Sequence, residues 1–257
     1  LPLFSFFFFF SSFPPPFFFY PPPPPPKSWK WAADVGGNYW RTAQDIRNEW
    51  SSVLYNFDTP YSVSDIAART SAGRYTFLDQ MVVGVVPHKG GISGPGLSPT
   101  ETVAHFTMWV MAASPLLICN DVRNMSSDLA ALLTHDEVLA VHKDPLNRMA
   151  VRMDVGGGAD ANAFARLQGV WDRPLANGDH AVMVLNRAET AVNYTLRMED
   201  VGTSLNTTYK ARDLWARSDL GVVVGNQGGK RRRKRGRKKR RRKKKKERKK
   251  KERKKKK

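Results

Sequence analysis

The sequence predicts an α/β region followed by an antiparallel β-sandwich, with disordered low-complexity ends. Strand-like and helix-like segments alternate from residue 28 to residue 147, an order that indicates parallel α/β packing. From about residue 150, short alternating stretches separated by Gly, Asn and Asp are typical of an antiparallel sandwich. We therefore divide the chain into residues 1–27, 28–149, 150–229 and 230–257.

Residues 1–27 form a Phe- and Pro-rich segment, with ten Phe and ten Pro among the first 26 residues. The prolines at 14–16 would break a helix after about a dozen residues, whereas a membrane-spanning helix needs about 20. The basic n-region and small-residue cleavage site of a signal peptide are not visible. We expect this segment to pack on nothing and to contribute no membrane span. A Pro-rich ligand for an aromatic groove is the alternative.

Residues 230–257 hold 25 Lys/Arg and two Glu, a net charge of +23, so the rest of the chain carries about −3 of the total +20. Such a tail has no apolar residue and cannot fold alone. It would bind phosphate backbones through counterion release. Without an aromatic residue to stack bases, that binding would be non-specific. The tail leaves a second class of function open, a non-catalytic protein that binds nucleic acid or acidic polymers.

Within the α/β region, three parallel strands are expected near residues 37–40, 76–83 and 115–118. Apolar residues at helical spacing in 46–54 predict the first helix between them. Three such units are too few to close an eight-unit barrel. The pattern fits either an open sheet or the last part of a barrel.

Later helices are marked by their start signals. Ser98-Pro99-Thr100-Glu101 is a capping box with Pro at the first helical position. Ser127 and a second capping box at residues 134–137 mark two further helices. In the sandwich region, glycines 156–158 and the Asn177-Gly178 pair predict turns.

Neither a metal nor a phosphate site is predicted. The single cysteine, Cys119, excludes an intramolecular disulfide and a zinc site built from cysteines. The glycine-rich runs lack the Lys-Ser/Thr of a P-loop. His135 and His142 lie seven residues apart and could share a helix face, but we interpret them as surface imidazoles.

Two aspartates are candidate catalytic residues. Asp45 follows the first strand, at the point that lies on the catalytic face of an α/β barrel. Its alternative role is helix capping, because Thr42 and Asp45 have the spacing of a capping box. Asp79 lies in an apolar strand, where a carboxylate is costly unless it is paired or emerges at the strand end. Two carboxylates after neighbouring strands are what glycosidic bond cleavage needs.

Three Asn-x-Ser/Thr triplets, at Asn124, Asn193 and Asn206, are glycosylation candidates if the chain enters the secretory route. Such triplets also arise by chance, so they do not fix the compartment.

Longer stretches of the sequence resemble the melibiase-type α-galactosidases. WRTAQDI (40–46) resembles the Trp-Arg-Thr-x-x-Asp-Ile segment of that family, and residues 101–146 resemble its run of helix, strand, Asp-Val-Arg-Asn-Met and Asp-Pro-Leu. VWDRPLANGDHAVMVLNR and ARDLWARSDLG resemble its C-terminal sandwich. The resemblance covers roughly residues 28–225 in collinear order.

The resemblance implies a retaining glycoside hydrolase, present here as the C-terminal part of a (β/α)8 barrel followed by a truncated antiparallel β-sandwich domain. Asp45 matches the family's acid/base, and Arg41 matches a substrate-contacting Arg. Asp79 matches the second Asp of its Gly-Gly-Trp-Asn-Asp-Pro-Asp-Met-Leu segment, a substrate-binding position. Phe77 replaces the first Asp, which implies a change in pocket geometry or aglycone preference.

The family's nucleophile lies in an upstream Lys-Tyr-Asp type segment, and residues 1–27 contain no acidic residue. We therefore expect this chain to offer no nucleophile and to be inactive as written. The implied activity is hydrolysis of terminal α-linked galactose in oligosaccharides or glycoconjugates. An α-N-acetylgalactosaminidase of the same family is the alternative. The resemblance further implies no cofactor, no metal, a dimer as one oligomeric state and the secretory route, either extracellular, vacuolar or lysosomal.

Overall fold

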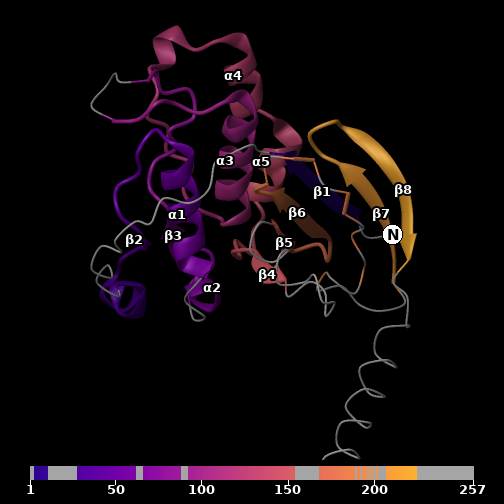
Figure 1. The fold of residues 1–257 in the computed structure, drawn as a ribbon. Helices are drawn as coiled ribbons and strands as arrows, with labels where there is room; N and C mark the ends of the chain where they lie inside the picture. Colours follow the sequence, from indigo (N-terminus) through magenta and orange to yellow (C-terminus); the bar gives the residue numbers. More distant parts are fainter. Residues whose placement is uncertain are drawn as a thin grey trace, which may run out of the picture.

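The computed structural model shows a helical region beside a six-stranded sheet (Figure 1). It describes residues 3–10, 28–61, 66–87, 92–153, 168–188 and 207–224, with residues 190, 191, 193, 194, 196, 198 and 201 between the last two ranges. The basic tail and the predicted turn at 156–158 lie outside the described residues.

The helical region contains the predicted parallel strands. β2 (Tyr39–Arg41) and β3 (Tyr75–Phe77) are hydrogen-bonded in parallel. A parallel bridge joins Met81 to Ile118, and the Met81 N–H donates to the Leu117 carbonyl over 2.6 Å. The parallel order of three strand segments is therefore confirmed. The second segment is interrupted, however, because residues 78–80 leave the strand before the bridge forms.

Eight helical elements are described in this region: η1 (Ser28–Lys30), η2 (Ala32–Val35), α1 (Trp50–Tyr61), α2 (Ile66–Arg69), α3 (Pro99–Met111), η3 (Val122–Asn124), α4 (Ser127–Leu133) and α5 (Asp136–His142). The start of α3 confirms the predicted capping box. The Glu101 N–H donates to the Ser98 hydroxyl, and the Ser98 N–H donates back to the Glu101 carboxylate over 2.6 Å. Pro99 occupies the first helical position, where its missing N–H costs nothing.

The first helix starts later than predicted. α1 begins at Trp50, whereas the apolar spacing of the sequence extends back to Ile46. Ile46 is buried, and its N–H donates to the Asp79 carboxylate. The Asn48 carbonyl accepts from the Gly96 N–H over 2.9 Å, so residues 42–49 form a loop bound to other segments and not a turn of α1.

The second predicted capping box is wrong. Thr134 ends α4, and its hydroxyl donates to the Ala130 carbonyl over 2.7 Å. Because that hydroxyl is engaged within α4, His135 caps α5 instead, with Nδ1 accepting from the Val138 N–H. The cap of α4 is Ser126, one residue before the predicted signal.

The second region is a sheet with strand order β4-β5-β6-β1-β7-β8. Its strands are β1 (Leu3–Phe10), β4 (Val151–Met153), β5 (Gln168–Pro174), β6 (His180–Asn186), β7 (Thr208–Asp213) and β8 (Ser218–Val224). The pairs β4–β5, β5–β6 and β7–β8 are antiparallel, as predicted. The Asn177-Gly178 turn joins β5 to β6, and Gly178 adopts a φ of 88°, a conformation that favours glycine.

The N-terminal strand β1 corrects the prediction that residues 1–26 are disordered and pack on nothing. Residues 3–10 lie between β6 and β7 and pair in parallel with both. Phenylalanine is favoured in strands because it fits a pleated, half-buried surface. The backbone of this run also pairs with the edges of β6 and β7 that face each other. An unpaired strand edge favours the addition of another strand. Residues 11–27 lie outside the described part of the chain.

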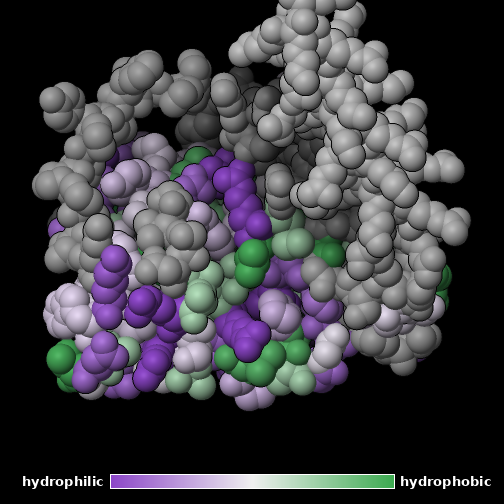
Figure 2. Space-filling view, turned by 90° about the horizontal axis from the view of Figure 1, so that it is seen from below, coloured by the Kyte–Doolittle hydropathy of each residue, from purple (hydrophilic) through white to green (hydrophobic). Residues whose placement is uncertain are grey.

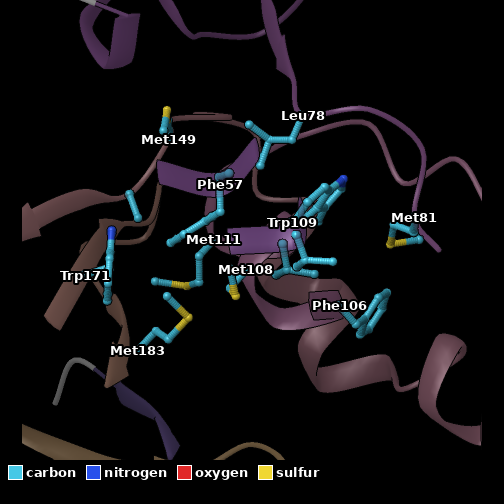
Figure 3. Packing of buried hydrophobic residues seen from close by; sticks show 14 of the residues in the cluster. Phe57, Leu78, Met81, Phe106, Met108, Trp109, Met111, Met149, Trp171 and Met183 are labelled. Carbon is cyan, nitrogen blue, oxygen red and sulfur yellow. The ribbon is translucent and has the colours of Figure 1, made fainter. Parts of the chain in front are cut away.

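Helix α3 lies between the two regions and carries much of their shared core. Met108, Trp109 and Met111 are fully buried on α3, and Trp171 and Met183 are buried on the sheet side. Figure 3 shows Met111 and Met183 close together beside Trp171. One continuous cluster of buried residues thus joins the regions, which fixes the helices relative to the sheet.

Polar contacts reinforce this junction. The Arg173 guanidinium from β5 donates to the carbonyls of Val110 and His142 in the helical region. Burial lowers the pKa of Arg173 to about 10. Two ion pairs also connect the regions: Arg187 with Asp58 at 2.7 Å, and Arg212 with Glu137 at 2.7 Å.

The molecular surface mixes hydrophilic and hydrophobic residues on the face viewed from below (Figure 2). Large apolar side chains are exposed on β2 and in the segment before it: Trp31, Val35 and Tyr39. Among the described residues, the helices are too short or too polar to cross a membrane.

Candidate active site

Three predicted site residues meet at the carboxyl ends of β2 and β3. Arg41 ends β2, Asp45 follows in the loop, and Asp79 follows β3. The Arg41 Nη2 lies 3.0 Å from Asp45 Oδ1 and 2.9 Å from Asp79 Oδ2. The prediction that these side chains cluster is therefore confirmed. A single guanidinium nitrogen bridges two carboxylates that are 34 positions apart in the chain.

Asp79 is the buried member of the cluster. Its side chain is 12% exposed. Oδ2 accepts from the Ile46 N–H over 2.8 Å, and Oδ1 accepts from the Gln80 N–H over 2.8 Å. The carboxylate that looked costly inside an apolar strand is thus fully engaged by Arg41 and two backbone donors.

The backbone of Asp79 has a φ of 89°. A non-glycine residue at positive φ is uncommon and costs about 1–3 kcal/mol, so surrounding contacts must hold it there. This conformation turns the chain out of β3, and the strand resumes only at Met81. The break explains why a carboxylate can sit inside an apolar strand sequence.

Asp45 is the exposed member, with a side chain that is 95% exposed. The alternative that Thr42 and Asp45 form a capping box is wrong, because α1 begins only at Trp50. The Thr42 hydroxyl is buried and makes no hydrogen bond within the described residues. Asp45 therefore stands in a loop, in contact with Arg41 and open to solvent.

Gln80 and Cys119 extend the site toward the third strand segment. The Cys119 thiol donates to Gln80 Oε1 over 2.8 Å. Burial, and secondarily the charge of Asp79, raise the pKa of the Cys119 thiol to about 11. A protonated thiol is a poor nucleophile and a poor metal ligand. We therefore assign Cys119 no chemical step.

The arrangement offers two kinds of carboxylate. The exposed Asp45 can give a proton to a bound molecule and take one from water. Asp79 and Arg41 present an acceptor and a fork of donors, which suits the hydroxyl groups of a sugar. Within the described parts of the chain, no group of three or more His, Cys, Asp or Glu is placed to hold a metal ion.

The remaining sequence candidates lie away from this cluster. Asn124 and Asn193 are exposed, and Asn206 lies outside the described residues. The interpretation of His135 and His142 as surface imidazoles is wrong: His135 is buried and His142 is half-buried. Burial, with the nearby Arg173 and Lys143 charges, lowers the pKa of His142 to about 4.

Sequence reasoning missed the side chains that support Asp79 from behind. Trp109 donates its indole N–H to the Asp79 carbonyl over 2.8 Å, and His105 accepts from the Val82 N–H over 3.1 Å. Both lie on α3, one turn apart. The available signal was a pair of polar rings at i and i+4 on a helix whose other buried residues are mostly apolar.

Two family models match the chain. One, described as alpha galactosidase A, matches residues 27–144. The other, described as alpha galactosidase C-terminal beta sandwich domain, matches residues 167–233. Together these matches cover more than half of the chain. The gap between them, residues 145–166, contains the change from the helical region to the sheet.

Individual relatives agree with the family models. An alpha-galactosidase of Oryza sativa subsp. japonica is 32% identical over 190 residues, which cover 74% of this chain and 40% of the relative. An alpha-galactosidase of Coffea arabica is 32% identical over 195 residues, which cover 76% of this chain and 46% of the relative.

A solved structure shows the same fold. A β-L-arabinopyranosidase from Geobacillus stearothermophilus, in complex with arabinose, is 25% identical with a TM-score of 0.63, and the match covers 80% of this chain and 45% of that one. This chain thus spans less than half the length of these three proteins.

Proposed function

Because the chain belongs to the melibiase-type α-galactosidase family, we propose that Arg41, Asp45 and Asp79 form the acid/base half of a retaining α-galactosidase site. The observation that carries this proposal is the contact of one guanidinium nitrogen with both carboxylates at the carboxyl ends of parallel strands. In barrel enzymes this end of the strands holds the active site.

Asp45 is the acid/base in this proposal. In the first step its carboxyl group donates a proton to the glycosidic oxygen as the bond to the aglycone breaks. In the second step the resulting carboxylate takes a proton from the attacking water. The 95% exposure of its side chain leaves it open to both the leaving group and water.

Arg41 and Asp79 bind the sugar in this proposal. Arg41 keeps Asp45 within 3.0 Å, and Asp79 fixes Arg41 from the buried side.

A double displacement also needs a nucleophile about 5 Å from the acid/base. No Lys-Tyr-Asp segment occurs in residues 1–257. We propose that the nucleophile comes from outside this sequence and that the 257 residues alone do not turn over an α-galactoside.

A chimera tests the role of Asp45. The part of the rice alpha-galactosidase that precedes its match to this chain would be fused upstream of residue 28. We expect hydrolysis of an aryl α-galactoside. Asp45→Asn should lower kcat by about 10²- to 10⁴-fold, and most severely for poor leaving groups, which depend most on a proton donor. The matched control is Asp34→Asn, at an exposed aspartate in η2.

Azide provides a second measurement at the same position, on the variant Asp45→Ala. Because azide attacks without losing a proton, it should restore turnover of an activated substrate by Asp45→Ala and give a glycosyl azide of retained configuration. Equal activity of the Asp45→Asn and Asp34→Asn chimeras would contradict the assignment.

The substrate proposed is a terminal α-linked galactose, with α-linked N-acetylgalactosamine as the alternative. The secretory route is proposed for the compartment, and the exposure of Asn124 and Asn193 supports it because both would be accessible for glycosylation. We retain a dimer as the proposed assembly. No observation on the described residues favours the alternative of a basic-tailed binding protein.

A further inference from the structure

We propose that Trp109 is a positioning residue of the active site: its indole N–H holds the Asp79 backbone in a left-handed conformation, and Asp79 in turn sets the places of Arg41 and Asp45. The inference rests on the proposed function only for the catalytic role given to Arg41, Asp45 and Asp79. The geometry on which it stands is independent of that function.

The starting observation is the gap in the second strand. β3 ends at Phe77, and the bridge to the third segment forms only at Met81. Residues 78–80 therefore lie between two strand pairings, and the backbone polar groups of the buried residues among them need other partners. Leu78 is fully buried and Asp79 nearly so.

Side chains supply those partners. The Leu78 N–H donates to the Ser114 hydroxyl over 3.1 Å, and its carbonyl accepts from the Asn56 amide over 3.0 Å. The Asp79 carbonyl accepts from Trp109 Nε1 over 2.8 Å. Figure 3 shows Trp109 with its indole nitrogen directed toward the chain between Leu78 and Met81.

The contact of Trp109 falls on the strained residue. A φ of 89° at Asp79 persists only if its surroundings hold it. The Trp109 hydrogen bond fixes the direction of the carbonyl at that residue. With the backbone so fixed, the carboxylate reaches Arg41 Nη2 at 2.9 Å and the Ile46 N–H at 2.8 Å.

The same carboxylate then positions the acid/base loop. The Ile46 N–H belongs to the residue after Asp45, so its hydrogen bond to Asp79 brings the loop toward β3. The Asp79–Arg41 contact fixes the guanidinium that holds Asp45. The buried Trp109 indole on α3 thus influences the position of the exposed Asp45 carboxylate. It does so through Asp79 and Arg41.

A role in packing alone is the competing explanation, and the chain contains a matched control for it. Trp171 is also fully buried, but its Nε1 makes no hydrogen bond within the described residues. Trp171→Phe therefore removes the same atoms from the core without removing a bond to Asp79. A difference between Trp109→Phe and Trp171→Phe reports on the indole N–H.

The test is made on the full 257-residue chain, by crystallography and by D-galactose titration. In Trp109→Phe we expect Asp79 to leave positive φ and the Arg41–Asp79 contact to open beyond hydrogen-bonding distance. Trp171→Phe should keep both. If the wild-type chain binds galactose, Trp109→Phe should weaken that binding about fivefold, the value of one hydrogen bond. Trp171→Phe should leave the affinity unchanged.

If Trp109→Phe does not fold, 3-benzothienylalanine at position 109 removes the N–H while preserving ring size and should give the same result. Retention of the Asp79 conformation and of the Arg41 contact in these variants would overturn the inference. Absence of galactose binding by the wild-type chain would count against the proposed function alone, because the geometric result does not depend on the sugar.

Discussion

The two regions of the molecule hold their backbones in different ways. In the sheet, β5 and β6 pair over their whole length, from Gln168 with Asn186 to Pro174 with His180. In the parallel segment, β2 and β3 share only three residue pairs. Beyond these pairs, buried side chains of α1 and α3 bind the backbone of residues 78–82.

This difference shows where single substitutions should matter. In a backbone ladder every residue type can accept and every type except proline can donate, so most side-chain changes leave its hydrogen bonds intact. A backbone held by particular side chains loses its partner when one of them is replaced, and an unsatisfied buried group costs about 1–3 kcal/mol. Polar side-chain changes behind the active site should therefore cost more than comparable changes in the sheet.

The largest expected effect is acid sensitivity through His105. Burial lowers its pKa to about 3 from an ordinary 6.5, and Nε2 must stay unprotonated to accept from the Val82 N–H. The unfolded chain takes up a proton below pH 6.5, whereas the folded chain does not until near pH 3. Stability is therefore lost as pH falls between these values, by about 2–3 kcal/mol from pH 6.5 to pH 4.5.

Urea unfolding of wild type and His105→Gln at pH 7 and pH 4.5 measures this effect. Glutamine keeps an acceptor for the Val82 N–H but does not titrate, so the variant should lose less stability on acidification than wild type does. The same loss in both proteins would exclude His105 as the source.

The next prediction compares the loss of stability on replacing two buried asparagines. The Asn56 amide donates to the carbonyls of Gln44 and Leu78, each over 3.0 Å, and so ties the acid/base loop to the Asp79 segment. Asn56→Ala leaves the buried Leu78 carbonyl and the half-buried Gln44 carbonyl without this donor and should cost about 1–3 kcal/mol. Asn186→Ala, at the end of β6, should cost about 1 kcal/mol. Denaturant midpoints at pH 7 compare them, and a larger loss for Asn186→Ala would reverse the comparison.

A smaller effect is expected at the junction of the regions. Arg187 pairs with Asp58 at 2.7 Å, but the Asp58 side chain is 39% exposed. Solvent screening limits such a pair to about 0.5–1 kcal/mol. Arg187→Met should therefore lower the unfolding free energy by about that amount at low salt. In 1 M salt, thermal unfolding should show a smaller difference from wild type, whereas a difference that does not depend on salt would indicate packing.

The smallest effect concerns the thiol beside the site. The charge of Asp79 is one of the causes that raise the pKa of Cys119 to about 11. Asp79→Asn removes that charge, so the pKa should fall slightly and alkylation by iodoacetamide at pH 8 should quicken about two- to fivefold. Asp121→Asn, close in sequence, serves as the control and should leave the rate unchanged. Equal rates in the two variants would show that Asp79 does not act on the thiol.

The order of strands, helices and turns along the chain follows from local sequence patterns. Alternating strand and helix patterns, the Ser98 capping box and the Asn177-Gly178 turn depend on neighbours within a few residues, and all three are present in the structure. The resemblance of residues 40–46 to a known family also indicates Arg41 and Asp45 as site residues, and the two side chains are in contact. These features are local, so the sequence alone is enough to find them.

Other features depend on partners that are distant in the sequence, and these features emerge only when the chain is folded. α1 starts only at Trp50, after a loop whose Ile46 N–H binds Asp79 and whose Asn48 carbonyl binds the Gly96 N–H. Residues 3–10 become a strand because β6 and β7 present edges between which they pair. Asp79 occupies a left-handed conformation because Trp109, 30 positions later, binds its carbonyl. Each outcome is set by a hydrogen bond between segments far apart in the chain, and no periodicity or local propensity carries that information.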